Sequence, residues 1–121
     1  MNIVIIGLGL IGGSIAKSLS VIDKVKIKAF DMNKDSINNA LENGSIHGAI
    51  HSLEELKNKE FNNSIIIIAT PPSAVVNVLK SISFLFNSTA TITDTTSTKS
   101  LLDQCLKEFD FPNNVIFSHP V

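Results

Sequence analysis

The chain has 121 residues with 44% hydrophobic content, which is enough for the core of one domain covering residues 1–121. Its formal net charge of −1 argues against nucleic acid or an anionic membrane as the main partner, and no apolar run reaches the roughly 18 residues that cross a bilayer. The single cysteine, Cys105, excludes an internal disulfide, so we expect a protein of the reducing cytoplasm.

The first predicted element is a buried strand that runs into a glycine-rich turn. Residues 3–6 are apolar and β-branched, as a strand buried on both faces requires. The pattern Gly-x-Gly-x-x-Gly follows, in which the glycines permit a tight turn, close approach of a pyrophosphate and close packing of the next helix. Because strand, turn and helix agree, the segment favours a dinucleotide site over glycine-rich packing. The expected cofactor contacts are Gly7, Leu8, Gly9, Leu10, Ile11 and Gly12.

A helix and a second strand are predicted after the turn. The helix carries an apolar stripe at helical spacing, formed by Ile11, Ile15, Leu19 and Ile22. The strand at 25–30 ends in Asp31, 19 residues after Gly12. A carboxylate there accepts hydrogen bonds from a ribose 2′-hydroxyl and repels a 2′-phosphate. Since the chain has no arginine to bind that phosphate, we expect NAD rather than NADP, with Asp31 and Met32 as contacts.

Strands and helices alternate along the rest of the chain. One helix is expected to begin at a cap on Asn33 or Asp35 and to end at Gly44. Further helical segments are predicted over 52–57, 73–86 and 98–108, and further strands near 49–50, 64–69, 90–93 and 114–118. This order predicts an α/β fold: a doubly wound, mostly parallel six-stranded sheet of the Rossmann type, with helices on both faces and strand order 3-2-1-4-5-6.

Such sheets bind their ligands outside the carboxyl ends of the strands. We therefore expect further cofactor contacts from Asp94, after the fifth strand, and from a segment after the fourth strand that consists of Ala69, Thr70 and Pro71. Ser97 follows in a cluster that also reads as an ordinary helix N-cap. Lys99, in the first turn of a helix, is disfavoured by the macrodipole, which suggests a bound anion, although a surface lysine is the simpler interpretation.

Among the three histidines, His119 is the strongest catalytic candidate. It lies past the last strand on the ligand edge, where an imidazole accepts a proton from a substrate hydroxyl as hydride leaves. Position alone does not separate this role from that of a capping histidine held by the following proline. His47 and His51 are interpreted as surface or half-buried side chains, and Cys105 as a small packed hydrophobe. No metal site is expected.

Four segments together resemble the N-terminal domain of prephenate dehydrogenase and its arogenate-using relatives. They are residues 6–14, Asp31, residues 69–72, and the pair formed by 93–99 and 118–120. The resemblance implies an enzyme of tyrosine biosynthesis that oxidises a cyclohexadienol bearing two carboxylates. Hydride passes to NAD while the ring carboxylate leaves as carbon dioxide.

The resemblance also implies roles for residues that position alone left open. By their place in the family motifs, His119 accepts a hydrogen bond from the reacting hydroxyl and Ser97 supports that histidine. Ser97, Lys99 and His119 are then the expected substrate contacts, and prephenate or arogenate is the expected substrate. In its full-length form the family is a homodimer, which this protein is expected to share.

In the family, a helical second domain follows the Ser-His-Pro segment and supplies basic residues for the substrate carboxylates. This chain ends at Val121 and has no arginine, so we expect that domain to be absent from the chain. The chain alone should then bind NAD without turning over prephenate, and exposed hydrophobic surface should favour self-association. Two alternatives stay open: the cofactor domain of another two-domain reductase, and a regulatory module that senses a nucleotide without chemistry.

Overall fold

The computed structural model describes residues 1–95, 99–108 and 112–117. Six strands form one sheet: β1 (Asn2–Ile6), β2 (Lys26–Phe30), β3 (Gly48–Ala49), β4 (Ile65–Ile68), β5 (Thr91–Asp94) and β6 (Val115–Ile116). Every neighbouring pair is parallel, and the strand order is β3-β2-β1-β4-β5-β6. The predicted fold class and strand order are therefore confirmed.

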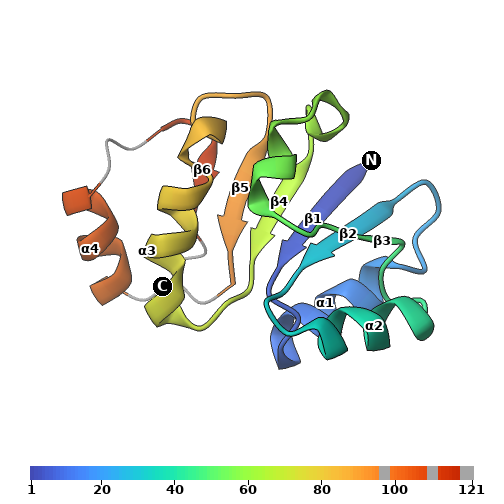
Figure 1. The fold of residues 1–121 in the computed structure, drawn as a ribbon. Helices are drawn as coiled ribbons and strands as arrows, with labels where there is room; N and C mark the ends of the chain where they lie inside the picture. Colours follow the sequence, from blue (N-terminus) through green and yellow to red (C-terminus); the bar gives the residue numbers. More distant parts are fainter. Residues whose placement is uncertain (96–98, 109–111, 118–121) are drawn as a thin grey trace.

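Helices cover both faces of the sheet (Figure 1). They are α1 (Leu10–Leu19), α2 (Lys34–Glu42), α3 (Pro72–Ser81) and α4 (Lys99–Glu108), with short 3-10 turns η1 (Leu53–Lys57), η2 (Lys59–Phe61) and η3 (Ser83–Leu85). Side chains of β1 alternate between two cores. Ile3 and Ile5 pack with α1 and α2, whereas Val4 and Ile6 pack with η1 and α3. A strand buried on both faces accounts for the uninterrupted apolar run at 3–6.

The caps predicted for α2 are present. Asn33 accepts hydrogen bonds from the backbone N–H groups of Asp35 and Ser36 at 2.9 and 3.3 Å, so Asn33 rather than Asp35 is the N-cap. Gly44, with φ of +78°, follows the C-cap Asn43 in the left-handed conformation that ends many helices.

The stripe predicted for α1 is wrong in part. Ile11 and Ile22 are 48% and 49% exposed, whereas the buried residues of the helix are Gly12 and Ala16. A Cβ on Gly12 would overlap the carbonyl oxygen of Gly7, so α1 lies too close to the sheet for large side chains along its contact line. The bulky residues fall on its flanks, and Ile22 lies beyond the end of the helix.

The predicted helix 73–86 is also shorter than expected. It ends at Ser81, and the chain continues through the tighter turn η3, with Ile82 and Leu85 still buried. A helical spacing of apolar residues does not distinguish one α-helix from an α-helix followed by a 3-10 turn. Within the described ranges, no helix is long and apolar enough to pass through a membrane.

Candidate functional site

The carboxyl ends of β1, β2, β4 and β5 meet at one edge of the sheet. The strands pair in register, with Ile6 opposite both Phe30 and Ile68, and Ile68 opposite Asp94. In Figure 1 these strand ends point towards the side of the molecule where α1 and α3 begin. The edge brings together the predicted contact residues after the four strands.

Two glycines of the turn are fixed by packing within the protein. Gly7 has φ of +101° and donates its N–H to the carbonyl of Phe30 at 2.8 Å. A Cβ on Gly7 would lie 2.9 Å from the carbonyl oxygen of Ala69, and a Cβ on Gly12 would overlap the backbone of Gly7. These two positions would require glycine even if the protein bound no ligand.

Gly9 is different, because the described part of the protein gives no reason for glycine there. Its φ of −67° suits any residue, and no described atom lies within 4 Å of the place of a Cβ. Gly9 is also the N-cap of α1, and no described side chain caps that helix or puts an acid in its first turn. Free N–H groups beside open space are the setting in which a helix N-terminus binds a phosphate. The turn therefore fits the pyrophosphate of a dinucleotide.

The carboxylate of Asp31 joins the end of β2 to this turn. Its Oδ2 accepts the backbone N–H of Leu8 at 2.7 Å, and its Oδ1 accepts that of Asn33 at 2.8 Å. Each carboxylate oxygen keeps a further lone pair, so Asp31 can still accept hydrogen bonds from the two hydroxyls of a ribose. The carboxylate thus has two roles, one structural and one directed to a ligand.

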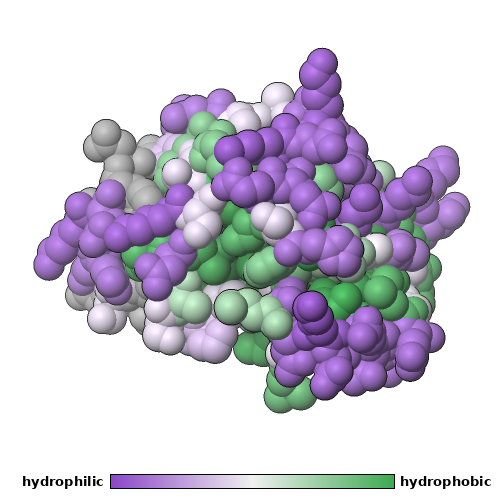
Figure 2. Space-filling view, viewed as in Figure 1, coloured by the Kyte–Doolittle hydropathy of each residue, from purple (hydrophilic) through white to green (hydrophobic). Residues whose placement is uncertain are grey.

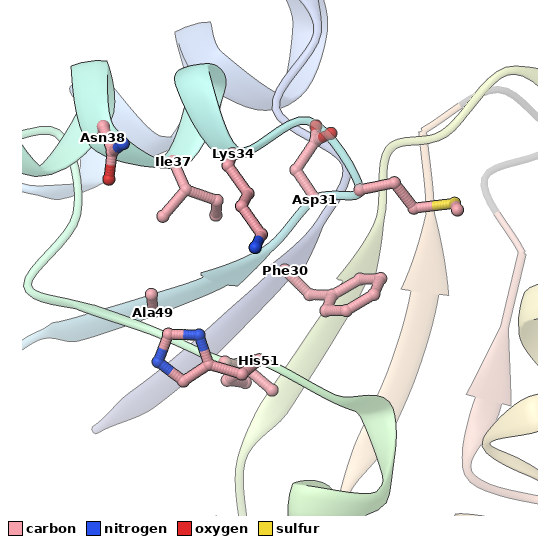
Figure 3. A pocket seen from close by; sticks show the side chains of 9 residues that line it. Phe30, Asp31, Lys34, Ile37, Asn38, Ala49 and His51 are labelled. Carbon is pink, nitrogen blue, oxygen red and sulfur yellow. The ribbon is translucent and has the colours of Figure 1, made fainter.

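A cavity of about 350 Å³ opens next to Asp31, between β2, α2 and the end of β3 (Figure 3). The ammonium of Lys34 points into it, and the imidazole of His51 lies on the facing wall. The carboxylate of Glu55 accepts the backbone N–H groups of His51 and Ser52 at 2.6 and 3.0 Å, which holds the chain here and lowers the pKa of Glu55. Both side chains are exposed, which agrees with the surface interpretation of His51, and both also line this cavity.

The segment after β4 lies beside the glycine turn. Ala69 donates its N–H to the carbonyl of Ile6 at 2.8 Å, which extends the ladder between β4 and β1. Thr70 follows, and Pro71 and Pro72 begin α3 as its N-cap and first residue. Asp94, at the end of β5, is only 3% exposed. All four expected cofactor residues of these two strands are thus on the same edge as Gly9 and Asp31.

Apolar side chains also surround this edge. Leu10 and Met32 are 93% and 91% exposed, and Ile11 is half exposed. Figure 2 shows hydrophobic surface between the polar side chains of α2 and those of α4. Lys99 is the first residue of α4, as its predicted position in a first helical turn requires. Ser97 and His119 lie outside the described residues, so their roles stay predictions.

Reactive or metal-binding side chains elsewhere in the described residues do not form a second site. No three histidine, cysteine, aspartate or glutamate side chains there gather as metal ligands. His47, just before β3, uses its Nδ1 to accept the backbone N–H of Ile27 in β2 at 3.0 Å.

Cys105 is expected to behave as an unreactive core residue. It is 1% exposed, and burial, followed by the charges of Asp94 and Glu108, raises the pKa of its thiol. Because the thiolate is the reactive form, alkylation by iodoacetamide at pH 7.5 should be slower than that of the denatured chain by a factor on the order of 100 or more. Mass spectrometry over time measures both rates. Equal rates in the folded and denatured chain would contradict the packed position.

Comparisons with known proteins agree with this geometry. The family described as "Prephenate dehydrogenase, nucleotide-binding domain" matches residues 15–121. The chain is similar to prephenate dehydrogenase from Aquifex aeolicus, solved with hydroxyphenyl propionate and NAD+, at 29% identity and a TM-score of 0.77. That match covers 100% of this chain and 42% of the Aquifex chain.

Two further structures show how far the similarity extends. Arogenate dehydrogenase from Synechocystis has 25% identity and a TM-score of 0.73, and the match covers 89% of this chain and 37% of that one. Scyllo-inositol dehydrogenase from Lactobacillus casei has 14% identity and a TM-score of 0.69, over 98% of this chain and 36% of the other, and therefore shares the fold alone. The chain spans less than half the length of each of these proteins.

Proposed function

The chain belongs to the prephenate dehydrogenase family, through that family's nucleotide-binding domain, and we propose that it holds NAD for the oxidation of prephenate or arogenate. The observation that carries the proposal is Gly9, for which packing among the described residues gives no reason and which lies at the start of α1, where no described side chain caps the helix. The glycine turn lies before the matched residues 15–121, so the structure of this turn and the family match are separate lines of support.

Different described residues would bind different parts of the cofactor. The N–H groups at the start of α1 bind the pyrophosphate, and the space in front of Gly9 admits it. Asp31 accepts the hydroxyls of the adenosine ribose, and its charge disfavours the 2′-phosphate of NADP. Since β4 and β5 lie on the other side of β1 from β2, the nicotinamide half extends over Thr70, Pro71 and Asp94. When bound, the nicotinamide supplies the hydride acceptor.

The chemical step is assigned to residues near the end of the chain. His119 takes the proton of the substrate hydroxyl while the carbon that bears this hydroxyl loses a hydride, and Ser97 orients the imidazole. Loss of the ring carboxylate as carbon dioxide completes an aromatic ring, which makes the step effectively irreversible. Ser97 and Lys99 contact the substrate. These roles rest on the family resemblance of residues 93–99 and 118–120.

The proposal for the rest of the enzyme also rests on the family resemblance. The family's helical domain would supply further basic groups for the substrate carboxylates, because this chain has no arginine for bidentate binding of a carboxylate. We propose a homodimer in the full-length protein and a location in the cytoplasm, where the free thiol of Cys105 would stay reduced.

Calorimetric titration of the 121-residue chain with NAD, NADP and ATP tests the proposal. We expect NAD to bind and NADP to bind at least about tenfold more weakly, because its 2′-phosphate would meet the carboxylate of Asp31. ATP carries the same ribose diol and serves as the competing ligand. Tight ATP binding with no response to NAD would instead identify a nucleotide-sensing module and overturn the proposed function.

A further inference from the structure

Three buried hydroxyl oxygens have no hydrogen-bond partner within the described part of the chain. They belong to Ser64, Thr70 and Thr95. A buried polar group without a partner costs on the order of 1–3 kcal/mol, so each case requires an explanation. Ser64 precedes β4 at the amino edge of the sheet, whereas Thr70 and Thr95 lie at the carboxyl edge. Two of the three unpaired hydroxyls therefore lie at the proposed cofactor edge.

Thr95 is held firmly in place at this edge. It directly follows β5, and its N–H donates to the carbonyl of Ile68 at 3.1 Å, which extends the ladder between β4 and β5 by one residue. The strand position favours a β-branched residue, and valine is β-branched with the same shape as threonine. Valine would avoid the free-energy cost of an unpaired hydroxyl. Within the described residues, folding therefore gives no reason for threonine at this place.

The order of the strands indicates which part of a dinucleotide would reach Thr95. Asp31 follows β2, on one side of β1, and Thr95 follows β5, two strands from β1 on the other side. A dinucleotide whose pyrophosphate lies at the glycine turn, between them, extends its adenosine towards Asp31. Its other nucleoside then extends towards β4 and β5. That half carries two ribose hydroxyls and a carboxamide, all able to pair with a hydroxyl.

We propose that the Thr95 hydroxyl is a hydrogen-bond partner of the nicotinamide nucleoside. In the free protein this hydroxyl is unpaired within the described residues, and the stability that is lost in this way is the cost of keeping it for the cofactor. The inference rests on the proposed NAD-binding function. It makes Thr95 a positioning residue for the end of the cofactor that reacts. Removing the hydroxyl should therefore have opposite effects on the two properties, raising the stability of the free chain and lowering its affinity for the cofactor.

Thr95→Val in the 121-residue chain tests this, with Ser64→Ala as the matched control at the opposite edge. We expect Thr95→Val to raise the Tm of the free chain by about 3 °C and the Kd for NAD about 5- to 10-fold. The Kd for ADP, which lacks the nicotinamide nucleoside, should stay unchanged. Ser64→Ala should leave the Kd for NAD unchanged, whatever it does to Tm. Thr95→Ser, which keeps the hydroxyl, should bind NAD within about threefold of the original chain.

ADP-ribose locates the contact. If its Kd rises with that of NAD in Thr95→Val, the hydroxyl pairs with the ribose, and if only NAD weakens, it pairs with the carboxamide. An unchanged Kd for NAD, or an equal loss for ADP, would overturn the inference. If Thr95→Val does not fold, NAD binding by Thr95→Ser that is weakened more than about tenfold would do the same. Failure of the original chain to bind NAD would refute the proposed function instead.

Discussion

Gly9→Ala is expected to weaken NAD binding on the order of 100-fold while changing the free energy of unfolding by less than about 1 kcal/mol. The backbone at Gly9 has φ of −67°, which alanine adopts without strain, and no described atom lies within 4 Å of the added Cβ. The folded chain thus has room for the methyl group. A bound pyrophosphate does not, because the methyl group would occupy the space through which it approaches the start of α1.

Two other glycines of the same segment are the controls. Gly13 lies inside α1, and a Cβ there would lie 3.6 Å from the carbonyl oxygen of Leu8, which is an ordinary van der Waals contact. Gly13→Ala should therefore stabilise the chain by about 0.5–1 kcal/mol and retain NAD binding. Gly12→Ala would overlap the backbone of Gly7 and should destabilise the chain by about 3 kcal/mol or more.

Chemical denaturation and calorimetric titration of the three variants separate these effects. We expect Gly9→Ala to fold and bind NAD weakly, Gly13→Ala to fold and bind NAD normally, and Gly12→Ala to fold poorly. Normal NAD binding by Gly9→Ala would show that the pyrophosphate does not lie at this turn.

The fold was predictable because its signals are local. The apolar run at 3–6 and the run of four isoleucines in β4 identify strands that are buried on both faces, and the rule for strand order in doubly wound sheets supplies the topology. Strand and helix ends were less accurate. β3 is Gly48–Ala49 and β6 is Val115–Ile116, whereas strands were expected near 49–50 and over 114–118. Their exact ends depend on pairing across the sheet, which the sequence does not state.

The site was predictable in outline for a related reason. The expected cofactor residues come from strand ends, and a parallel sheet gathers its strand ends at one edge. The details depend on contacts between residues far apart in sequence. Nothing in the sequence indicates that Asp31 would accept the N–H of Leu8, that Lys34 would point into a cavity towards His51, or that the hydroxyl of Thr95 would be buried without a partner. These depend on how closely elements pack, as does the exposure of Ile11.

Asp31→Ala is expected to weaken NAD binding by about 30-fold and to reduce the preference for NAD over NADP to near unity. Two losses combine in this variant. The ribose loses its charged acceptor, and the N–H of Leu8 loses the carboxylate that holds the glycine turn in place at 2.7 Å. For NADP, the loss of the acceptor is offset by removal of the charge that repels its 2′-phosphate.

Asp35→Ala is the matched control for this variant, because it removes the same charge from the first turn of α2, four residues away. It should lower stability slightly through the helix dipole and leave the ratio of the two Kd values unchanged. Titration of both variants with NAD and NADP at low salt gives the ratios directly. Asp31→Ala should also lower the free energy of unfolding by about 1–2 kcal/mol, since the turn loses a charge-assisted hydrogen bond. A lower stability with an unchanged NAD-to-NADP ratio would mean that Asp31 only supports the turn and that the ribose lies elsewhere.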